Sequence, residues 1–142
     1  ELRRASLQVA LLVGARSANK HLPDNLLNAA AGEIQKATDD GSTGYHGLVT
    51  DLLREKLAMG KNYTVNTCGP HAMMAAVTAI CGEGRVPCQA SLEEYMACGF
   101  GVCVGCVVEV MPAEHASLAS PYLQYSRICV DGPVFDAHRV CW

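Results

Sequence analysis

Three cysteines within nine residues of a glycine-rich segment constrain this chain more than any other feature. Cys98, Cys103 and Cys106 lie in MACGFGVCVGCVVEV (96–110), and Cys129 completes the spacing C-x4-C-x2-C-x22-C. This is the spacing of a plant-type 2Fe-2S site, in which two irons take four thiolates. A loop that supplies three ligands must wrap closely around the cluster, and glycines permit that wrap because they adopt positive φ angles. We therefore predict a 2Fe-2S centre held by these four cysteines.

The eight cysteines of this 142-residue chain leave two other interpretations to weigh. A structural zinc site is also often made of four cysteines, but it favours paired C-x2-C knuckles, and the second pair is missing here. A disulfide framework is typical of secreted cysteine-rich chains, yet tight cysteine clusters without a secretory signal usually bind metal. The spacing thus favours an iron–sulfur site. The alternative is a zinc-stabilised binding module without redox activity. We interpret Cys81, Cys88 and Cys141 as packing residues, since a lone cysteine is commonly a small buried hydrophobe.

Strand-sized apolar runs alternate with helical patterns as far as about residue 92. LQVALLV (7–13) is an almost continuous apolar run and predicts a buried parallel strand. Further strands are predicted in EIQKATDDG, NYTVNTCG and RVPCQASLEEY, and helices in HLPDNLLNAAAG, HGLVTDLLREKLAMG and PHAMMAAVTAICG. Such alternation indicates an α/β fold with a parallel sheet. In the last of these helices we expect Gly82 to be the stop, and the predicted buried stripe is Met73, Ala76, Val77 and Ile80.

From about residue 93 the pattern changes to glycine, cysteine and short β-prone runs. CVVEV, SRICV and PVFDAHRV are predicted strands, VDGPV is a predicted turn and MPAEHASLASP a predicted loop. This places Cys129 on a strand, RICVDG, from which it closes the fourth ligand position. We therefore predict two domains, an α/β domain over 1–92 and a small irregular β annex over 93–142 that binds the cluster.

Three predicted strands end in glycine or acidic residues, namely GARS (14–17), TDDG (38–41) and CGP (68–70). In a parallel sheet the C-terminal strand ends line the ligand crevice. Asp39 and Asp40 could accept hydrogen bonds from ribose hydroxyls and would repel a 2'-phosphate, which favours NADH over NADPH. An ordinary turn remains the alternative, because the usual G-x-G-x-x-G is absent. The candidate nucleotide contacts are Gly14, Arg16, Ser17, Asp39, Asp40, Cys68, Gly69 and Pro70.

Charge and hydropathy exclude several other functions. The formal net charge is -3, so nothing argues for binding to nucleic acid or to an anionic membrane. No apolar run reaches the length that spans a membrane, and no signal peptide precedes the first strand, so we expect a cytoplasmic protein. The five histidines show no ligand spacing, and no Ser/His/Asp arrangement stands out. No catalytic residue is therefore predicted.

Several segments strongly resemble one family, the electron-transfer subunits of dihydroorotate dehydrogenase B, within the ferredoxin reductase superfamily. They are CGPHAMM (68–74), CQASLEEYMACGFGVCVGCVV (88–108) and RICVDGPVFDAHRV (127–140). LLVGARS (11–17) and TDDGSTGYHGLVTDLL (38–53) resemble the same family's pyridine-nucleotide domain. The resemblance covers nearly the whole chain, and its cysteine block with DGPVFDA is highly specific.

The resemblance implies a route for electrons. NADH reduces FAD, and single electrons reach a 2Fe-2S cluster and then FMN in a catalytic partner subunit that interconverts dihydroorotate and orotate. Full-length members are expected to form heterotetramers with that subunit. By resemblance, the four cysteines are the cluster ligands, the three strand ends line the NADH crevice, and Cys68 and Gly69 lie near nicotinamide and flavin.

This chain also departs from the family's pattern. The family carries an FAD-binding β-barrel before the nucleotide domain, and nothing here matches it. The first strand and glycine-rich turn of the nucleotide domain are missing too, and ELRRAS (1–6) is similar to the end of the helix that follows that turn. We therefore expect a C-terminal fragment that lacks most of the FAD site, has an incomplete NADH site, is inactive alone and is prone to self-association. Related reductase subunits serve hydrogenases or ferredoxin:NADP oxidoreductases, but SLEEYMACGFG favours dihydroorotate dehydrogenase.

Overall fold

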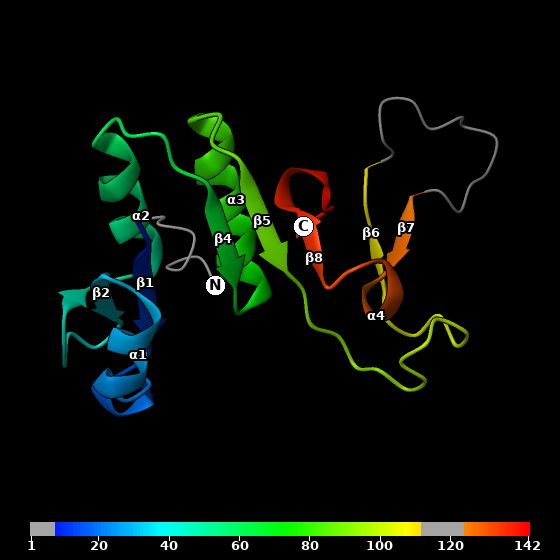
Figure 1. Ribbon diagram of the computed structural model, residues 1–142, viewed down its shortest axis with the longest axis horizontal. Coiled ribbons are helices and arrows are strands. Elements are labelled where there is room, and N and C mark those ends of the chain that lie inside the picture. Colours follow the sequence, from blue (N-terminus) through cyan, green and yellow to red (C-terminus); the bar gives the residue numbers. More distant parts are fainter. Residues whose placement is uncertain (1–7, 112–123) are drawn as a thin grey trace. The chain divides into compact units, whose positions relative to one another are not determined.

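The computed structural model describes residues 8–111 and 124–142, and the chain divides into two units, Glu1–Lys61 and Asn62–Trp142 (Figure 1). The segment ELRRAS and most of the predicted loop MPAEHASLASP lie outside the described residues. The predicted domain boundary after residue 92 falls inside the second unit and stays a prediction.

The first unit is built around a parallel three-stranded sheet. Its elements in chain order are β1 (Ala10–Ala15), a 3-10 turn η1 (Ala18–Lys20), α1 (Asp24–Ala30), β2 (Glu33–Thr38), β3 (Tyr45–His46) and α2 (Val49–Ala58). The sheet order is β1-β2-β3, with Ala10 opposite Glu33 and Ala15 opposite Thr38. α2 packs on β1 and β2, and α1 packs on β2. This arrangement confirms the predicted α/β class with a parallel sheet.

Local sequence explains most of this unit. Leu52 and Leu53 bury the inner face of α2, and the Asp51 carboxylate accepts a hydrogen bond from the Leu48 N–H at 3.1 Å, at the start of the helix. Gly60 lies just after the helix and has a φ of 71°, the left-handed conformation that commonly ends a helix. One expectation is corrected, because β1 is an edge strand of its sheet and the apolar run 11–13 is only half-buried.

The second unit contains a mixed sheet and a separate two-stranded ribbon. Its elements are β4 (Val65–Cys68), α3 (His71–Glu83), β5 (Cys88–Ser91), β6 (Val107–Glu109), β7 (Tyr125–Arg127), α4 (Ile128–Asp131), β8 (Val134–Asp136) and a 3-10 turn η2 (Ala137–Arg139). β4 and β5 are parallel, and β8 joins β5 antiparallel, so the C-terminal segment completes a sheet begun by the α/β segment. β6 and β7 form the antiparallel ribbon.

The inner face of α3 differs from the predicted stripe. The structure buries Met74, Val77, Thr78, Ile80 and Cys81, whereas Met73 is half-buried and Ala76 is exposed. The spacing 74, 77, 78, 81 is one helical face, but α3 is apolar all round, so the pattern could not select this face. The helix also runs past Gly82 to Glu83, with Gly84 as its cap, which corrects the predicted stop.

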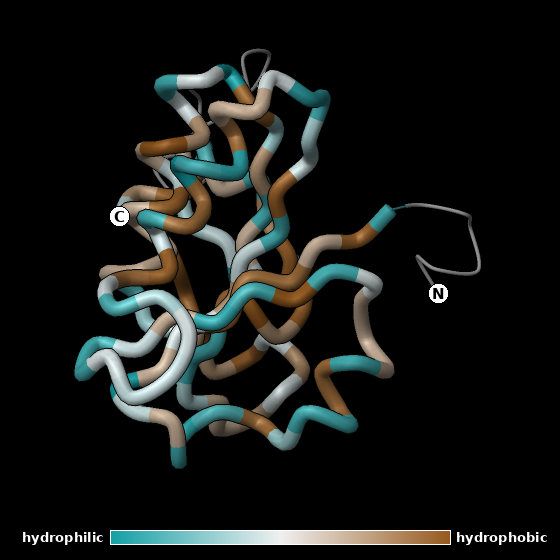
Figure 2. Tube along the Cα trace, turned by 90° about the vertical axis from the view of Figure 1, so that its left-hand side faces the viewer, coloured by the Kyte–Doolittle hydropathy of each residue, from teal (hydrophilic) through white to brown (hydrophobic). Residues whose placement is uncertain are grey.

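Hydrophobic segments are short throughout the described residues. In Figure 2 the brown stretches of the trace are repeatedly interrupted by teal residues. Within residues 8–111 and 124–142, none of the helices has the length and apolar character needed to cross a membrane.

Candidate metal centre

The four predicted ligands come from two segments of the second unit. Cys98, Cys103 and Cys106 belong to the loop that joins β5 to β6, and they are half-buried, exposed and buried respectively. Cys129 is half-buried in the short helix α4, which corrects its predicted place on a strand. The backbone N–H of Ile128 donates to the Cys106 carbonyl at 3.0 Å and so fixes α4 against the end of the loop (Figure 1).

Cys98 and Cys103 form the first pair of neighbouring thiols. The backbone N–H groups of Cys103 and Phe100, followed by the Cys103 side chain, stabilise the Cys98 thiolate and lower the pKa of Cys98 to about 6. Gly99 and Gly101 take φ angles of 73° and 85°, and these positive angles turn the loop backbone so that its N–H groups can face the Cys98 sulfur. The loop is therefore organised to hold a thiolate at Cys98.

Cys106 and Cys129 form the second pair. The backbone N–H of Cys129 and then its side chain lower the pKa of Cys106. The same thiol contact with Cys106 raises the pKa of Cys129. The backbone N–H of Gly101 also interacts with the Cys129 sulfur. The second pair is thus linked to the loop that carries the first.

The donor set fits an iron–sulfur centre in chemistry and in pairing. Within the described part of the chain, no three His, Cys, Asp or Glu side chains converge on a single metal-binding point. The four thiols instead form two neighbouring pairs, and a 2Fe-2S cluster takes four thiolates. Backbone N–H groups directed at the sulfurs supply the donors that cluster ligands need.

Arg127 and Asp131 lie beside the second pair, and the sequence analysis did not identify them. Arg127 donates to the Asp131 carboxylate from Nε at 3.2 Å and from Nη2 at 3.3 Å, and its Nη1 donates to the Gly101 carbonyl at 3.2 Å. The backbone N–H of Arg127 also donates to Asp131 at 2.8 Å. The signal in the sequence was the R-x-x-x-D spacing around Cys129, which becomes an i,i+4 pair because this segment turns helical.

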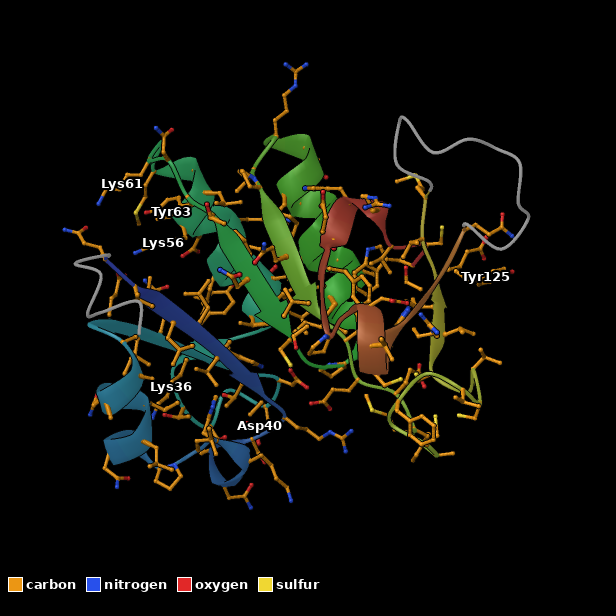
Figure 3. All side chains as sticks on the ribbon, turned by 45° about the vertical axis from the view of Figure 1, so that its right-hand side comes forward. Lys36, Asp40, Lys56, Lys61, Tyr63 and Tyr125 are labelled. Carbon is orange, nitrogen blue, oxygen red and sulfur yellow. The ribbon has the colours of Figure 1, made fainter. Side chains whose placement is uncertain are left out.

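Five of the candidate nucleotide contacts come together in the first unit. The N–H groups of Asp39 and Asp40 donate to the carbonyls of Ala15 and Arg16, each at 3.2 Å, which joins the ends of β1 and β2. Asp40, labelled in Figure 3, accepts hydrogen bonds from the hydroxyl and the backbone N–H of Ser42, which lower its pKa. The carboxylate of Asp40 is therefore partly engaged within its own loop. Gly14, Arg16, Ser17 and Asp39 border the same strand ends.

The other three candidate contacts lie in the second unit. Cys68 ends β4 and is exposed, Gly69 has a φ of 147°, and Pro70 precedes the first turn of α3. A Cβ on Gly69 would lie 2.8 Å from the Met73 methyl, so glycine is needed at this turn. Whether all eight residues form one nucleotide site stays a prediction.

Cys81 and Cys88 are buried together between α3 and β5, as expected for packing cysteines. Burial, followed by the charge of Cys81, raises the pKa of Cys88 from 9.0 to about 12. Burial also raises the pKa of Cys81. Cys141 is exposed, which corrects its interpretation as a packing residue.

We expect the second unit to lose stability in alkali because of Cys88. A raised pKa in the folded state means that the stability is fully present below pH 9 and is lost as the pH rises through about 12. Urea unfolding followed by the fluorescence of Trp142, the only tryptophan, measures this loss. Cys88→Ala lowers the stability at pH 8 but flattens its fall above pH 9. An equal slope in both proteins would contradict the assignment.

Comparison with known families gives a match over the cysteine segment. Residues 93–141 match the family model described as the iron-sulfur cluster binding domain of dihydroorotate dehydrogenase B. The chain is 34% identical over 142 residues to the electron transfer subunit of dihydroorotate dehydrogenase B (NAD(+)) from Desulforamulus reducens, with 100% of this chain and 52% of the relative covered. The same subunit from Caldanaerobacter subterraneus is 43% identical over 109 residues, which are 77% of this chain and 40% of that protein.

A solved structure is similar over nearly the same extent. It is the NADH-dependent reduced ferredoxin-NADP oxidoreductase, described in connection with flavin-based electron bifurcation. The TM-score is 0.77 at 29% identity, and the match covers 99% of this chain and 47% of that one. The chain therefore spans about half the length of the curated relatives and of the solved chain that it matches.

Proposed function

We propose that this chain, a homologue of the electron-transfer subunit of dihydroorotate dehydrogenase B, carries the cluster through which that subunit passes electrons from NADH toward pyrimidine biosynthesis. The observation that carries the proposal is the set of four cysteines in two pairs, each with one thiol of lowered pKa, within a segment that matches the cluster-binding family. The complex as a whole would be an NADH-linked oxidoreductase.

The ligands of a 2Fe-2S cluster would be Cys98, Cys103, Cys106 and Cys129. The pairing supports one iron held by Cys98 and Cys103 and the other by Cys106 and Cys129. Such a cluster, when bound, accepts and releases one electron at a time. The chain's own part is to present thiolates, to direct backbone N–H groups at the sulfurs and to shelter Cys106, which is 3% exposed.

NADH would bind at the strand ends of the α/β segment. The candidate contacts are Gly14, Arg16, Ser17, Asp39, Asp40, Cys68, Gly69 and Pro70. The hydrogen-bonded ends of β1 and β2 and the glycine turn after β4 support this proposal. An exposed carboxylate at Asp39 would accept from ribose hydroxyls and disfavour a 2'-phosphate, which makes NADH the preferred nucleotide.

We also propose how the chain divides into domains. Residues 1–92 would be a partial nucleotide-binding domain of the ferredoxin reductase type and 93–142 the cluster-binding subdomain. β1 and β4 are edge strands of two separate sheets, and each pairs on one side only in the described residues. Such open edges support the proposal that the domain is partial. FAD would bind in the full-length subunit, and the isolated fragment would not oxidise NADH efficiently.

The partner would be the FMN-containing catalytic subunit. Exposed apolar side chains near the cysteines support a docking surface in this region, since Tyr95 is 96% exposed, Phe100 70% and Val102 74%. They also support self-association of the chain when it is alone. A second candidate acceptor is a ferredoxin or NADP-linked partner, which the likeness to a ferredoxin-NADP oxidoreductase favours.

The proposal is tested by electron delivery to orotate. The chain is reconstituted with iron and sulfide, reduced anaerobically with dithionite and freed of excess reductant. It is then mixed with orotate and the FMN-containing catalytic subunit of a dihydroorotate dehydrogenase B. We expect about one dihydroorotate for every two chains, since each supplies one of two electrons. Electron transfer to oxidised ferredoxin, with none to orotate, would overturn this proposal in favour of the second candidate.

A further inference from the structure

We propose that Arg127 and Asp131 form an ion-paired clamp, which fastens the cysteine loop to α4 and sets the electrostatic potential at the cluster. This inference deepens the proposed function and rests on the cluster site described there. Both residues lie outside the ligand set, and their positioning role has a measurable electrochemical consequence. The clamp is defined as Arg127, Asp131 and the Gly101 carbonyl that Arg127 contacts.

The geometry of the clamp joins the two ligand-bearing segments. On one side of the guanidinium, Nε and Nη2 of Arg127 donate to the Asp131 carboxylate at 3.2 and 3.3 Å. The third nitrogen is thereby directed at the Gly101 carbonyl, at 3.2 Å, in the middle of the cysteine loop. Gly101 in turn interacts through its N–H with the Cys129 sulfur. The fork of an arginine, unlike the single ammonium of a lysine, can make both contacts at once.

The contact with Gly101 is closely packed. Gly101 is buried, and a Cβ added there would lie 3.1 Å from Arg127 Nη1 and 2.7 Å from a methyl of Val130. The backbone of the loop therefore lies directly against α4 and the arginine. A side chain at this position would separate the loop from the clamp.

The clamp places opposite charges beside the second pair of thiols. Arg127 and Asp131 each lie two residues from Cys129 in the sequence, and the guanidinium donates to the carbonyl of Gly101 at 3.2 Å. The cation is thus held against Gly101, the loop residue whose N–H interacts with the Cys129 sulfur. Both side chains of the ion pair are about two-fifths exposed, at 40% and 39%, and such pairs contribute little to stability. The ion pair therefore contributes to the position of the loop and to the electrostatic potential at the cluster, rather than to the free energy of folding.

The two charges predict opposite electrochemical shifts. Arg127→Gln leaves the carboxylate of Asp131 unopposed, which disfavours the added electron and lowers the midpoint potential. Asp131→Asn leaves the guanidinium unopposed and raises it. We expect a change of about tenfold in each reduction equilibrium, which is about 59 mV for one electron. The double variant returns toward the wild-type potential because both charges are gone.

The first readout is an EPR-monitored redox titration of the reconstituted chain. Arg139→Gln is the matched control, because Arg139 likewise donates through Nε and Nη2 to a backbone carbonyl, that of Met111, at 3.3 and 3.0 Å. We expect no shift in the control. Shifts of the same sign in Arg127→Gln and Asp131→Asn, or no shift in either, would overturn the electrostatic part of the clamp.

The second readout is hydrogen exchange of the metal-free chain, which reports on the loop without a cluster. We expect faster exchange over residues 98–106 in Arg127→Gln and in Arg127→Lys, but not in Arg139→Gln. Arg127→Lys nevertheless keeps a potential near the wild type, because it keeps the charge. Unchanged exchange in Arg127→Gln would overturn the positioning role. Absence of iron and sulfide from the reconstituted wild type would instead overturn the proposed function.

Discussion

Cys106→Ser removes most of the iron and acid-labile sulfide from the reconstituted chain, whereas Cys141→Ser leaves both unchanged. Cys106 is 3% exposed, and the backbone N–H of Cys129 stabilises its thiolate. A serine hydroxyl does not ionise at neutral pH and offers a hard oxygen in place of a soft sulfur. We therefore expect about a tenfold loss of cluster occupancy. Iron and sulfide assays per chain measure the loss.

Cys141 is a matched control because it is an exposed cysteine in the same unit that lies outside both thiol pairs. Cys68→Ser extends the control to the end of β4, where the thiol is also exposed. Equal iron loss from Cys106→Ser and Cys141→Ser would mean that the metal is bound adventitiously. Full occupancy in Cys106→Ser would remove Cys106 from the ligand set.

Gly101→Ala has the second large effect, and it acts on the shape of the loop rather than on a ligand. The φ of Gly101 is 85°, where an alanine is strained by about 1–3 kcal/mol. Its Cβ would also lie 2.7 Å from the Val130 methyl, so the loop must move away from α4. The distance between the two thiol pairs then changes. We expect the cluster to be lost at least about tenfold faster in air, as followed by the decay of visible absorbance.

Gly105→Ala provides the comparison within the same loop. Gly105 does not have a positive φ, and an added Cβ would meet nothing closer than the Cys103 sulfur at 3.6 Å, an ordinary contact. We expect its cluster to decay at nearly the wild-type rate. If the two variants decay alike, the close approach of Gly101 to α4 is not what holds the loop in place.

The alternating strands and helices as far as about residue 92 could be predicted well, because local sequence patterns determine them. β1, α1, β2, α2, β4, α3 and β5 all follow from apolar periodicity together with glycine and proline at their ends. The inner face of α3 could not be predicted, because its residues are apolar on every side and the neighbouring strands decide which of them is buried. The half-buried state of β1 likewise depends on its pairing, which is on one side only among the strands that the structure describes.

The ligand set could be proposed from spacing alone, but its organisation could not. The hydrogen bonds that pair Cys98 with Cys103 and Cys106 with Cys129 arise from the path of the loop backbone. The segment RICVD reads as a strand because it is rich in β-branched residues, yet tertiary contacts turn it into α4. That helical turn also brings Arg127 and Asp131 together, so the clamp could not be predicted from a segment that reads as a strand.

We expect this chain to hold a 2Fe-2S cluster on Cys98, Cys103, Cys106 and Cys129. An EPR spectrum of the anaerobically prepared, dithionite-reduced chain tests this cluster, with iron, sulfide and zinc measured on the same sample. We expect a brownish protein with about two irons and two sulfides per chain and an EPR signal from one unpaired electron. A colourless protein with stoichiometric zinc and no EPR signal would contradict it.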